Sequence, residues 1–268
     1  MKHLKKIIFT AVLAAALSTS AFAESGFEFI LNVPLGMNID MGQSIRHSAK
    51  FNGETVYSAS FSADNFLGFT TGVEAQVGYM FHIKNNFGIS LLGEVGYRFD
   101  TITANYTYGY GTNNTYKDGD KLRENPITSS AHSFKIGLFP KFNINAFSIG
   151  IGGGIIIPVS GSIVYKGNDG VDLQLGDNYK AQFDKSQLPV GFYFKLSLDY
   201  SIFFTETSAL NLGLYATFTG VGSLKIPNYS TSIGIPPATM EVDTFYDRSF
   251  VGMDIGAQIG YRFGPKAF

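Results

Sequence analysis

The stretch SFVGMDIGAQIGYRF, residues 249–263, decides the fold of this chain. Apolar residues occupy every second position of it, and the positions between them are mostly small or polar. The apolar set is Val251, Met253, Ile255, Ala257, Ile259, Tyr261 and Phe263. The intervening set is Gly252, Asp254, Gly256, Gln258, Gly260 and Arg262. A period of two over this length predicts a β-strand that is apolar on one face only.

Seven segments upstream show the same alternation. They are residues 27–40, 67–84, 87–101, 133–144, 147–158, 188–202 and 209–220. Together with residues 249–263 they predict eight strands, each much longer than the five or six residues that are usual in soluble sheets.

The connections between these strands alternate in length. Short connections fall at residues 85–86, 145–146 and 203–208, and long ones at 41–66, 102–132, 159–187 and 221–248. This asymmetry is typical of barrels that span an outer membrane. The sequence therefore predicts an all-β fold, a closed eight-stranded antiparallel transmembrane barrel with short periplasmic turns and four long extracellular loops. Both termini would then be periplasmic.

A soluble barrel of the lipocalin type is the alternative, because it also has eight alternating strands. Two features favour lipid on the outside. The less apolar face carries mainly Gly, Ser, Thr and Asn, whereas a face in water would carry more Lys and Glu. Aromatic residues also gather near the strand ends, as the two interfacial girdles of a membrane barrel require.

The N-terminus predicts export. Residues 1–23 have the charged start, short apolar run and small-residue cleavage site of a signal peptide, so the barrel domain is expected to be residues 24–268. The chain has no Cys, which excludes disulfides and Cys-metal sites. Its 20 Lys and Arg nearly balance its 21 Asp and Glu, and no basic run exists, so nucleic acid is not an expected partner.

Charged residues on the inward face are the main candidate site. The expected lumen charge network is Glu28, Glu74, Glu94, Asp199 and Asp254 with Arg98, Lys135, Lys141, Lys195 and Arg262. Buried charges are costly unless paired, so the balanced set predicts a neutralised plug, with Glu74, Glu94 and Lys195 pairing near mid-height. A gated, narrow polar pore is the alternative.

Backbone-controlling residues in the strands lead to two more expectations. Gly150, Gly152 and Gly154 face inward and are expected to make room for a large neighbour, Lys141 or Tyr193. Pro34 lies inside the first strand, where it cannot donate a ladder hydrogen bond, so we expect a bulge or kink there.

No catalytic, cofactor-binding or metal-binding residues are expected. The glycine run at residues 150–154 lacks the Lys and helix of a phosphate loop. His47 and His132 have serines nearby in the sequence and His82 is at the periplasmic end, but the sequence shows no arrangement of nucleophile, base and orienting group, so an enzyme is not expected.

The motif Gly260-Tyr261-Arg262-Phe263 has two echoes, at residues 96–99 and 78–81. On these motifs the chain resembles small eight-stranded bacterial outer-membrane barrels of the OmpA-domain, OmpX and OmpW type. The resemblance implies a monomer in outer-membrane lipid, with Ile259, Tyr261 and Phe263 as the closing signature read by the assembly machinery. Here five further residues follow Phe263, and the sequence does not predict their role.

The long connections are rich in Tyr, Asn, Gly and Ser, which is the composition of adaptable recognition surfaces. The sequence therefore predicts a surface-interaction, adhesin-like protein that contacts host or other extracellular ligands without catalysis. The alternative is a narrow channel or transporter for small or apolar solutes.

Overall fold

The structure is a computed structural model, and it describes eleven stretches of the chain. These are residues 25–40, 44–51, 54–62, 64–84, 86–107, 124–166, 178–184, 189–221, 230–235, 238–245 and 250–267. The expected signal peptide lies outside them. All the regular elements within them are β-strands. Among the described residues, no helix has the length and apolar character needed to cross a membrane.

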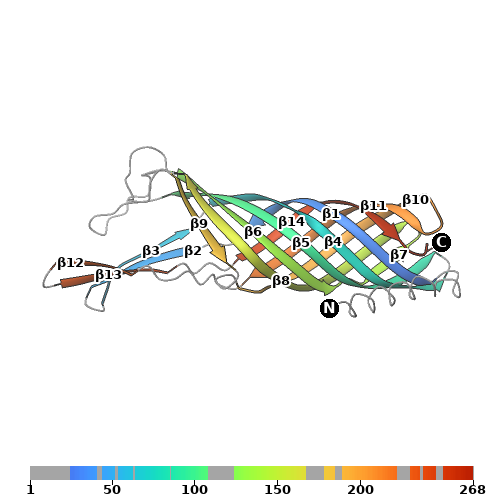
Figure 1. Cartoon of the computed structure of the whole chain (residues 1–268), viewed down its shortest axis with the longest axis horizontal. Coiled ribbons are helices and arrows are strands. Elements are labelled where there is room, and N and C mark those ends of the chain that lie inside the picture. Colours follow the sequence, from blue (N-terminus) through green and yellow to red (C-terminus); the bar gives the residue numbers. More distant parts are fainter. Residues whose placement is uncertain are drawn as a thin grey trace, which may run out of the picture.

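Antiparallel strands form a closed ring in the main sheet (Figure 1). Its wall consists of β1 (Gly26–Asp40), β4 (Asp64–Lys84), β5 (Phe87–Thr107), β6 (Glu124–Leu138) with β7 (Lys141–Ile144), β8 (Phe147–Lys166), β10 (Gly191–Phe203), β11 (Ser208–Val221) and β14 (Phe250–Phe263). The last strand, β14, pairs with both β11 and β1, which closes the ring. The expected closed barrel with eight wall positions is confirmed.

The fourth wall position is divided, although we expected one strand over residues 133–144. β6 and β7 are separated by Phe139 and Pro140. The register with β5 is the same on both sides of the break, since Leu138 pairs with Gly93 and Lys141 with Ser90. Pro140 has no N–H to donate, so it interrupts the ladder without displacing either part of the strand.

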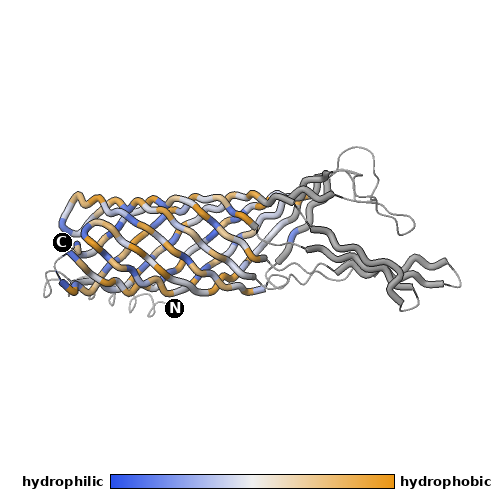
Figure 2. Tube along the Cα trace, turned by 180° about the vertical axis from the view of Figure 1, so that it is seen from behind, coloured by the Kyte–Doolittle hydropathy of each residue, from blue (hydrophilic) through white to orange (hydrophobic). Residues whose placement is uncertain are grey.

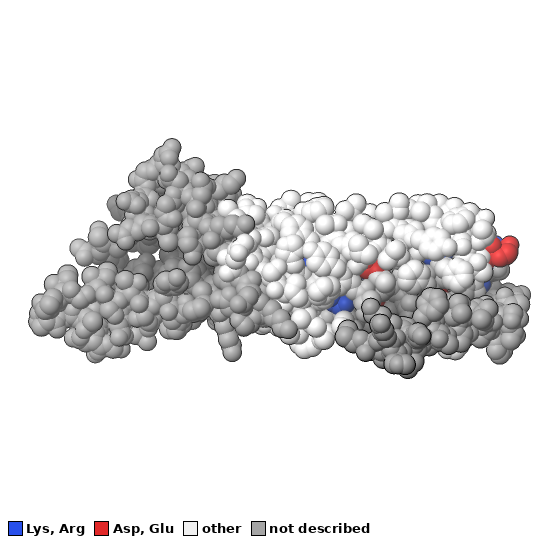
Figure 3. All heavy atoms as spheres, viewed as in Figure 1, with Lys and Arg blue, Asp and Glu red and all other residues white. Residues whose placement is uncertain are grey.

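Alternation of side chains between the two faces is strict along the wall. In β10 buried and exposed residues alternate from Gly191 to Ile202. Phe192 is 70% exposed, whereas the next residue, Tyr193, is 4% exposed. Figure 2 shows the same alternation of hydropathy along the other strands of the barrel. The outer surface is therefore apolar, and Figure 3 shows few charged atoms on it.

Two of the short turns rely on asparagine. Asn86 follows β4 with φ of 66°, and Asn145 follows β7 with φ of 55°. Asn tolerates this left-handed conformation better than most residues, and tight hairpins need it. The third short turn joins Phe203 of β10 to Ser208 of β11. All three lie at the barrel end where β1 begins and β14 ends.

At the opposite end several wall strands continue beyond their expected limits. β5 extends to Thr107, β6 begins at Glu124 and β8 extends to Lys166, where β9 (Asn178–Asp184) pairs with it. We had expected loops at 102–132 and 159–187. Beyond residue 100 the outward positions of β5 are occupied by Thr101 and Thr103 rather than by apolar residues, so the hydropathy pattern ends while the hydrogen-bonded ladder continues.

A second sheet is formed within the first and last long connections. Its strands are β2 (Ser44–Phe51), β3 (Glu54–Ser62), β12 (Ser230–Ile235) and β13 (Ala238–Phe245), in the order β12-β13-β2-β3. β13 pairs with β2, so segments from near the two ends of the chain meet in one sheet. The expectation that 41–66 and 221–248 are only loops was wrong.

The expected bulge at Pro34 was also wrong. Pairing of β1 with β4 omits Val33 and Pro34, but the register is the same before and after the gap. On the other side, Pro34 pairs with Gln258 of β14 without a shift. The Thr71 hydroxyl donates to the Pro34 carbonyl at 3.1 Å, which bridges β1 and β4 at the gap.

Candidate functional site

All ten charged residues expected in the lumen point inward, and each has an oppositely charged partner. The ion pairs are Arg98–Asp254, Lys135–Glu74, Lys135–Glu94, Lys195–Glu74, Lys195–Glu94, Lys141–Asp199 and Arg262–Glu28. Nine of the ten side chains are at most 6% exposed, and Arg98 is 11% exposed. These pairs form four successive levels along the barrel.

The central level is a square of two acids and two bases. Glu74 contacts both Lys135 and Lys195. Glu94 lies 3.1 Å from the Lys135 ammonium and 3.9 Å from that of Lys195. Tyr193 donates a hydrogen bond to Glu94 at 2.9 Å. Four charges that share their partners in this way neutralise one another in a region without bulk water.

Strand register explains why Glu74 and Lys135 meet. Gly96 of β5 pairs with Glu74 on one side and with Lys135 on the other. A Cβ at position 96 would lie 3.1 Å from Lys135 Cε and 3.3 Å from Glu74 Cγ. The glycine therefore lets the two charged side chains contact each other across an intervening strand.

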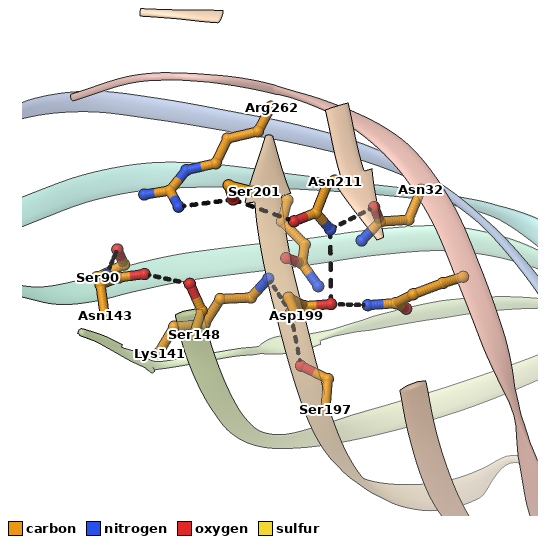
Figure 4. Close-up of polar contacts among 12 residues, drawn as sticks. Asn32, Ser90, Lys141, Asn143, Ser148, Ser197, Asp199, Ser201, Asn211 and Arg262 are labelled. Atoms are coloured by element: carbon orange, nitrogen blue, oxygen red, sulfur yellow. Dashed lines mark hydrogen bonds and ion pairs between the residues drawn. The ribbon is translucent and has the colours of Figure 1, made fainter. Parts of the chain in front are cut away.

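The next level toward the short turns is centred on Asp199. Its carboxylate pairs with Lys141 at 2.9 Å and accepts hydrogen bonds from Ser197 at 2.9 Å and Gln258 at 2.5 Å (Figure 4). The Gln258 carbonyl in turn accepts from Lys195 at 3.2 Å. This amide links the Asp199 level to the central square.

The level at the short-turn mouth consists of Arg262 and Glu28, which lie 2.8 Å apart. Arg262 also donates to the Ser201 hydroxyl at 3.1 Å (Figure 4) and to the Pro265 carbonyl at 3.4 Å. At the other end of the lumen, Arg98 lies 2.6 Å from Asp254 and 2.7 Å from Asp100.

Residues 264–267, called the tail here, run across the mouth instead of extending β14. The N–H of Gly264 donates to the Thr207 carbonyl in the turn between β10 and β11 at 2.8 Å. Lys266 pairs with Glu206 of the same turn at 3.3 Å. Ala267 is 1% exposed. The tail therefore covers the Arg262–Glu28 level.

The tail leads to a testable expectation about access to this mouth. Because the chain has no natural Cys, an Ala267→Cys variant places a single thiol at a buried position of the tail. In detergent-solubilised protein we expect that thiol to react with a bulky maleimide at least tenfold more slowly than the thiol of a Glu206→Cys control, since Glu206 is 92% exposed. Equal labelling rates would mean that the tail does not stay in the mouth.

Phe139 is a lumen residue that the sequence analysis missed. It is fully buried, and the ammonium groups of Lys141 and Lys195 lie 5.6 Å and 5.4 Å from its ring centre. A Cβ added at Gly150 or Gly152 would overlap this ring. The expectation that these glycines make room for Lys141 or Tyr193 was therefore wrong, because the large neighbour is Phe139.

Gly154 and Tyr193 also differ from what the sequence predicts. A Cβ added at Gly154 would meet the backbone of Ile136 and Gly137, so close approach of β6 and β8 is the constraint there. Tyr193 lies over Gly137 and not over the glycines of β8. The sequence could have indicated the direction of Phe139. Phe142 faces outward, so in an unbroken strand every odd-numbered residue, including Phe139, faces inward.

The closing signature lies on the outward face at the short-turn rim. Ile259 and Tyr261 are exposed, and the Tyr261 and Ser208 hydroxyls are 2.8 Å apart. Phe263 pairs with Phe29 of β1 and with Ser208 of β11. These residues therefore stand at the seam where the ring closes.

The structure gives the positions of two of the three histidines beyond the signal peptide. His132 lies on the outward face of β6, and His82 is near the end of β4, while the side chain of His47 is outside the described residues. Within the described ranges, no cluster of three or more His, Cys, Asp or Glu is arranged to hold a metal ion.

Comparison with known proteins gives weak structural similarities. No protein-family model and no curated protein matches the sequence. The outer membrane protease OmpT from Escherichia coli is 10% identical, with a TM-score of 0.41, over 88% of this chain and 96% of that one. Ail, the attachment invasion locus protein of Yersinia pestis, solved in complex with the heparin analogue sucrose octasulfate, is 12% identical with a TM-score of 0.33, over 88% and 99%.

The outer membrane protein OprG from Pseudomonas aeruginosa is 13% identical, with a TM-score of 0.29, over 90% of this chain and 98% of that one. These three proteins are thus a protease, an attachment protein and an outer membrane protein. Similarity at this level is too low to transfer any of these activities, so a function has to be argued from the lumen and the surface of this chain.

Proposed function

We propose that this protein is an integral outer-membrane barrel with a closed lumen, which holds its long connections outside the cell as an interaction surface. The outward face supports the membrane part of the proposal. Large apolar side chains such as Phe192, Leu138 and Leu214 are more than 60% exposed in the free chain. Continuous apolar surface of this extent is a liability in water and is expected in lipid.

The wall also has the height that a bilayer requires. β10 has 13 residues, which at a rise of about 3.3 Å and a tilt of about 45° cover about 30 Å along the barrel axis. The apolar band of an outer-membrane barrel is about 25 Å tall. A closed ring also leaves no unpaired strand edge in the hydrocarbon region.

The main observation that supports a closed lumen is that its charged side chains are paired with one another. A conducting pore keeps its polar groups hydrated, whereas Glu94, Lys195 and Lys141 are at most 1% exposed and have partners within the protein. Opening a path for solute would separate pairs at several levels. Charge separation in a region without water costs several kcal/mol per pair, so the barrel is proposed as a scaffold and not as a channel.

The closed lumen leaves the long connections as the part of the chain to which we assign the function. They leave the barrel at the end opposite both termini of the barrel domain, which places them outside the cell if the signal peptide directs export. Tyr, Ser, Gly and Asn make their surface suited to binding. The proposed role is adhesin-like contact with host or other extracellular ligands, by a monomer that needs no cofactor.

The test combines conductance with binding. The full protein in a planar bilayer is expected to give no steady ion current, and vesicles that carry it are expected to bind to at least one spot on an array of extracellular-matrix proteins and glycans. Replacing residues 108–123 and 167–177 by short Gly-Ser linkers leaves the ends of β5, β6, β8 and β9 in place and should abolish that binding. Glu206→Ala, in a short turn, is the matched control and should leave it unchanged.

Two outcomes would contradict the proposal. Large, steady conductance of the unmodified protein would replace the closed scaffold by a channel. Binding that survives removal of both segments, in protein that still shows the heat-dependent electrophoretic shift of a closed barrel, would exclude these two of the four long connections as the interaction surface.

A further inference from the structure

His132 is unusual among the outward residues of the wall. From the short turns up to the level of this residue, the outward side chains that the structure places on β1, β4 to β8, β10, β11 and β14 include no Asp, Glu, Lys or Arg except Lys84, which is next to the first short turn. Among these outward side chains, His132 is thus the one with a ring N–H that can donate to an anion. It stands on β6, opposite Phe99 of β5.

Two aromatic side chains contact the imidazole, and a third packs against one of them. The Tyr97 hydroxyl lies 2.5 Å from His132 Nδ1. The His132 ring centre is 4.9 Å from that of Phe99 and 6.1 Å from that of Tyr97, and Phe134 packs against Tyr97 at 5.9 Å. When Tyr97 donates to Nδ1, the ring proton of a neutral imidazole is on Nε2, which has no partner among the described residues.

The height of His132 matches the boundary of the bilayer. The outward apolar stretch from Phe134 to Ile144 covers about 23 Å of thickness, at about 3.3 Å per residue and a tilt of about 45°. That distance is close to the full apolar band. His132 is the next outward residue beyond Phe134, so its imidazole lies where lipid headgroups begin.

Outward residues beyond His132 carry hydroxyl groups. Ser130 and Ser162 of β6 and β8 have hydroxyls 2.8 Å apart, and those of Thr103 and Thr128 on β5 and β6 are 3.1 Å apart. The wall thus changes from aromatic to hydroxyl-bearing at the level of the imidazole. On β5, β6 and β8 the outward side chains that the structure places at this level, such as Thr103, Ser130 and Ser162, are not acidic.

We propose that Tyr97, Phe99, His132 and Phe134 bind the phosphate headgroup of one anionic lipid in the leaflet on the side of the long connections. His132 Nε2 donates to a phosphate oxygen, Tyr97 holds the imidazole in that orientation, and the Phe99 and Phe134 rings contact the upper part of the acyl chains. The inference rests on the proposed membrane insertion.

The experiment measures lipid retention. The full chain is placed in nanodiscs of four parts phosphatidylcholine to one part phosphatidylglycerol, released, and weighed by native mass spectrometry. We expect His132→Phe, which keeps a ring at the position, to lower the fraction of protein carrying phosphatidylglycerol about tenfold, since a hydrogen bond to a charged group is lost. Tyr97→Phe should lower it about threefold, and His82→Phe, near the other end of the barrel, should not change it.

Three results would overturn the site. The first is equal retention of phosphatidylglycerol by the unmodified protein and His132→Phe. The second is equal retention of phosphatidylcholine and phosphatidylglycerol by the unmodified protein. The third is displacement of the lipid by millimolar inorganic phosphate, which would indicate a site for a soluble anion. Failure of the unmodified protein to enter nanodiscs would count against membrane insertion itself. Each variant is scored only after unboiled electrophoresis shows a closed barrel.

Discussion

Lys195→Ala is expected to lower the free energy of unfolding by about 3–5 kcal/mol, because it leaves two buried carboxylates to share a single cation. Lys195 is fully buried and contacts Glu74 and Glu94, and its ammonium also lies over the Tyr215 ring. The retained Lys135 cannot neutralise both acids. Urea unfolding in lipid vesicles, followed by the electrophoretic shift of the closed barrel because the chain has no Trp, measures the change.

Lys266→Ala is the matched control for this prediction. It removes the same side chain from a pair in which Lys266 is 20% exposed and Glu206 is 92% exposed. An ion pair in that setting is worth about 0–1 kcal/mol. If the two variants lose similar amounts of stability, the lumen is hydrated and the closed-scaffold proposal loses its main support.

The second large effect concerns the packing of Phe139 against β8. Gly150→Leu is expected to lower the free energy of unfolding by about 1–3 kcal/mol or more through overpacking. The nearest atoms to an added Cβ there belong to the side chains of Phe139 and Ser197. Phe139→Ala alone should cost about 3–5 kcal/mol through the cavity it leaves.

Combining the two substitutions should cost clearly less than their sum, since the Leu side chain occupies the space of the missing ring. The same urea titration measures this coupling. Gly152→Leu is the comparison, because a Cβ at that position also meets the Leu138 carbonyl oxygen, which no side-chain substitution removes. Equal coupling at both glycines, or none at Gly150, would mean that Phe139 does not occupy this part of the lumen.

Much of the barrel could be predicted from the sequence because membrane strands obey a strict rule of two faces. The alternation from Val251 to Phe263 defines β14 almost to its end residues. The prediction failed where that rule no longer applies. From Thr101 onward the outward positions of β5 are polar, yet its backbone still pairs with β6 as far as Thr107, so outward hydropathy no longer indicates the strand.

The candidate site was predictable as a set but not as pairs. Inward parity identifies the ten charged residues without reference to the structure, but the expected set left out Asp100, which has the same parity and pairs with Arg98. The partner of each depends on strand register, as with Glu74 and Lys135, which meet over Gly96. Register depends on hydrogen bonding between strands far apart in the sequence, and a single sequence contains no direct measure of it.

Phe139 and the tail were missed for a different reason. Pro140 interrupts the hydropathy pattern between β6 and β7, so the alternation does not assign a face to the residue before it. Phe139 nevertheless faces inward. The tail lies beyond the last strand, where alternation says nothing. Its position follows from contacts with Thr207 and Glu206, in a turn that becomes its neighbour only when β14 pairs with β11.

The pairing of β1 with β14 has a consequence for how the molecule forms. Every other neighbouring pair in the wall joins strands that follow one another along the chain, so each can zip from its own connection. The seam from Leu31 opposite Tyr261 to Met37 opposite Ile255 joins the two ends of the domain. Closing this seam has the largest loop-closure entropy cost in the wall, because its strands are the farthest apart in the sequence. That cost is offset only once the hydrogen bonds of the seam have formed. The seam is therefore the slowest ladder to form, and until it does both terminal strands keep an open hydrogen-bonding edge.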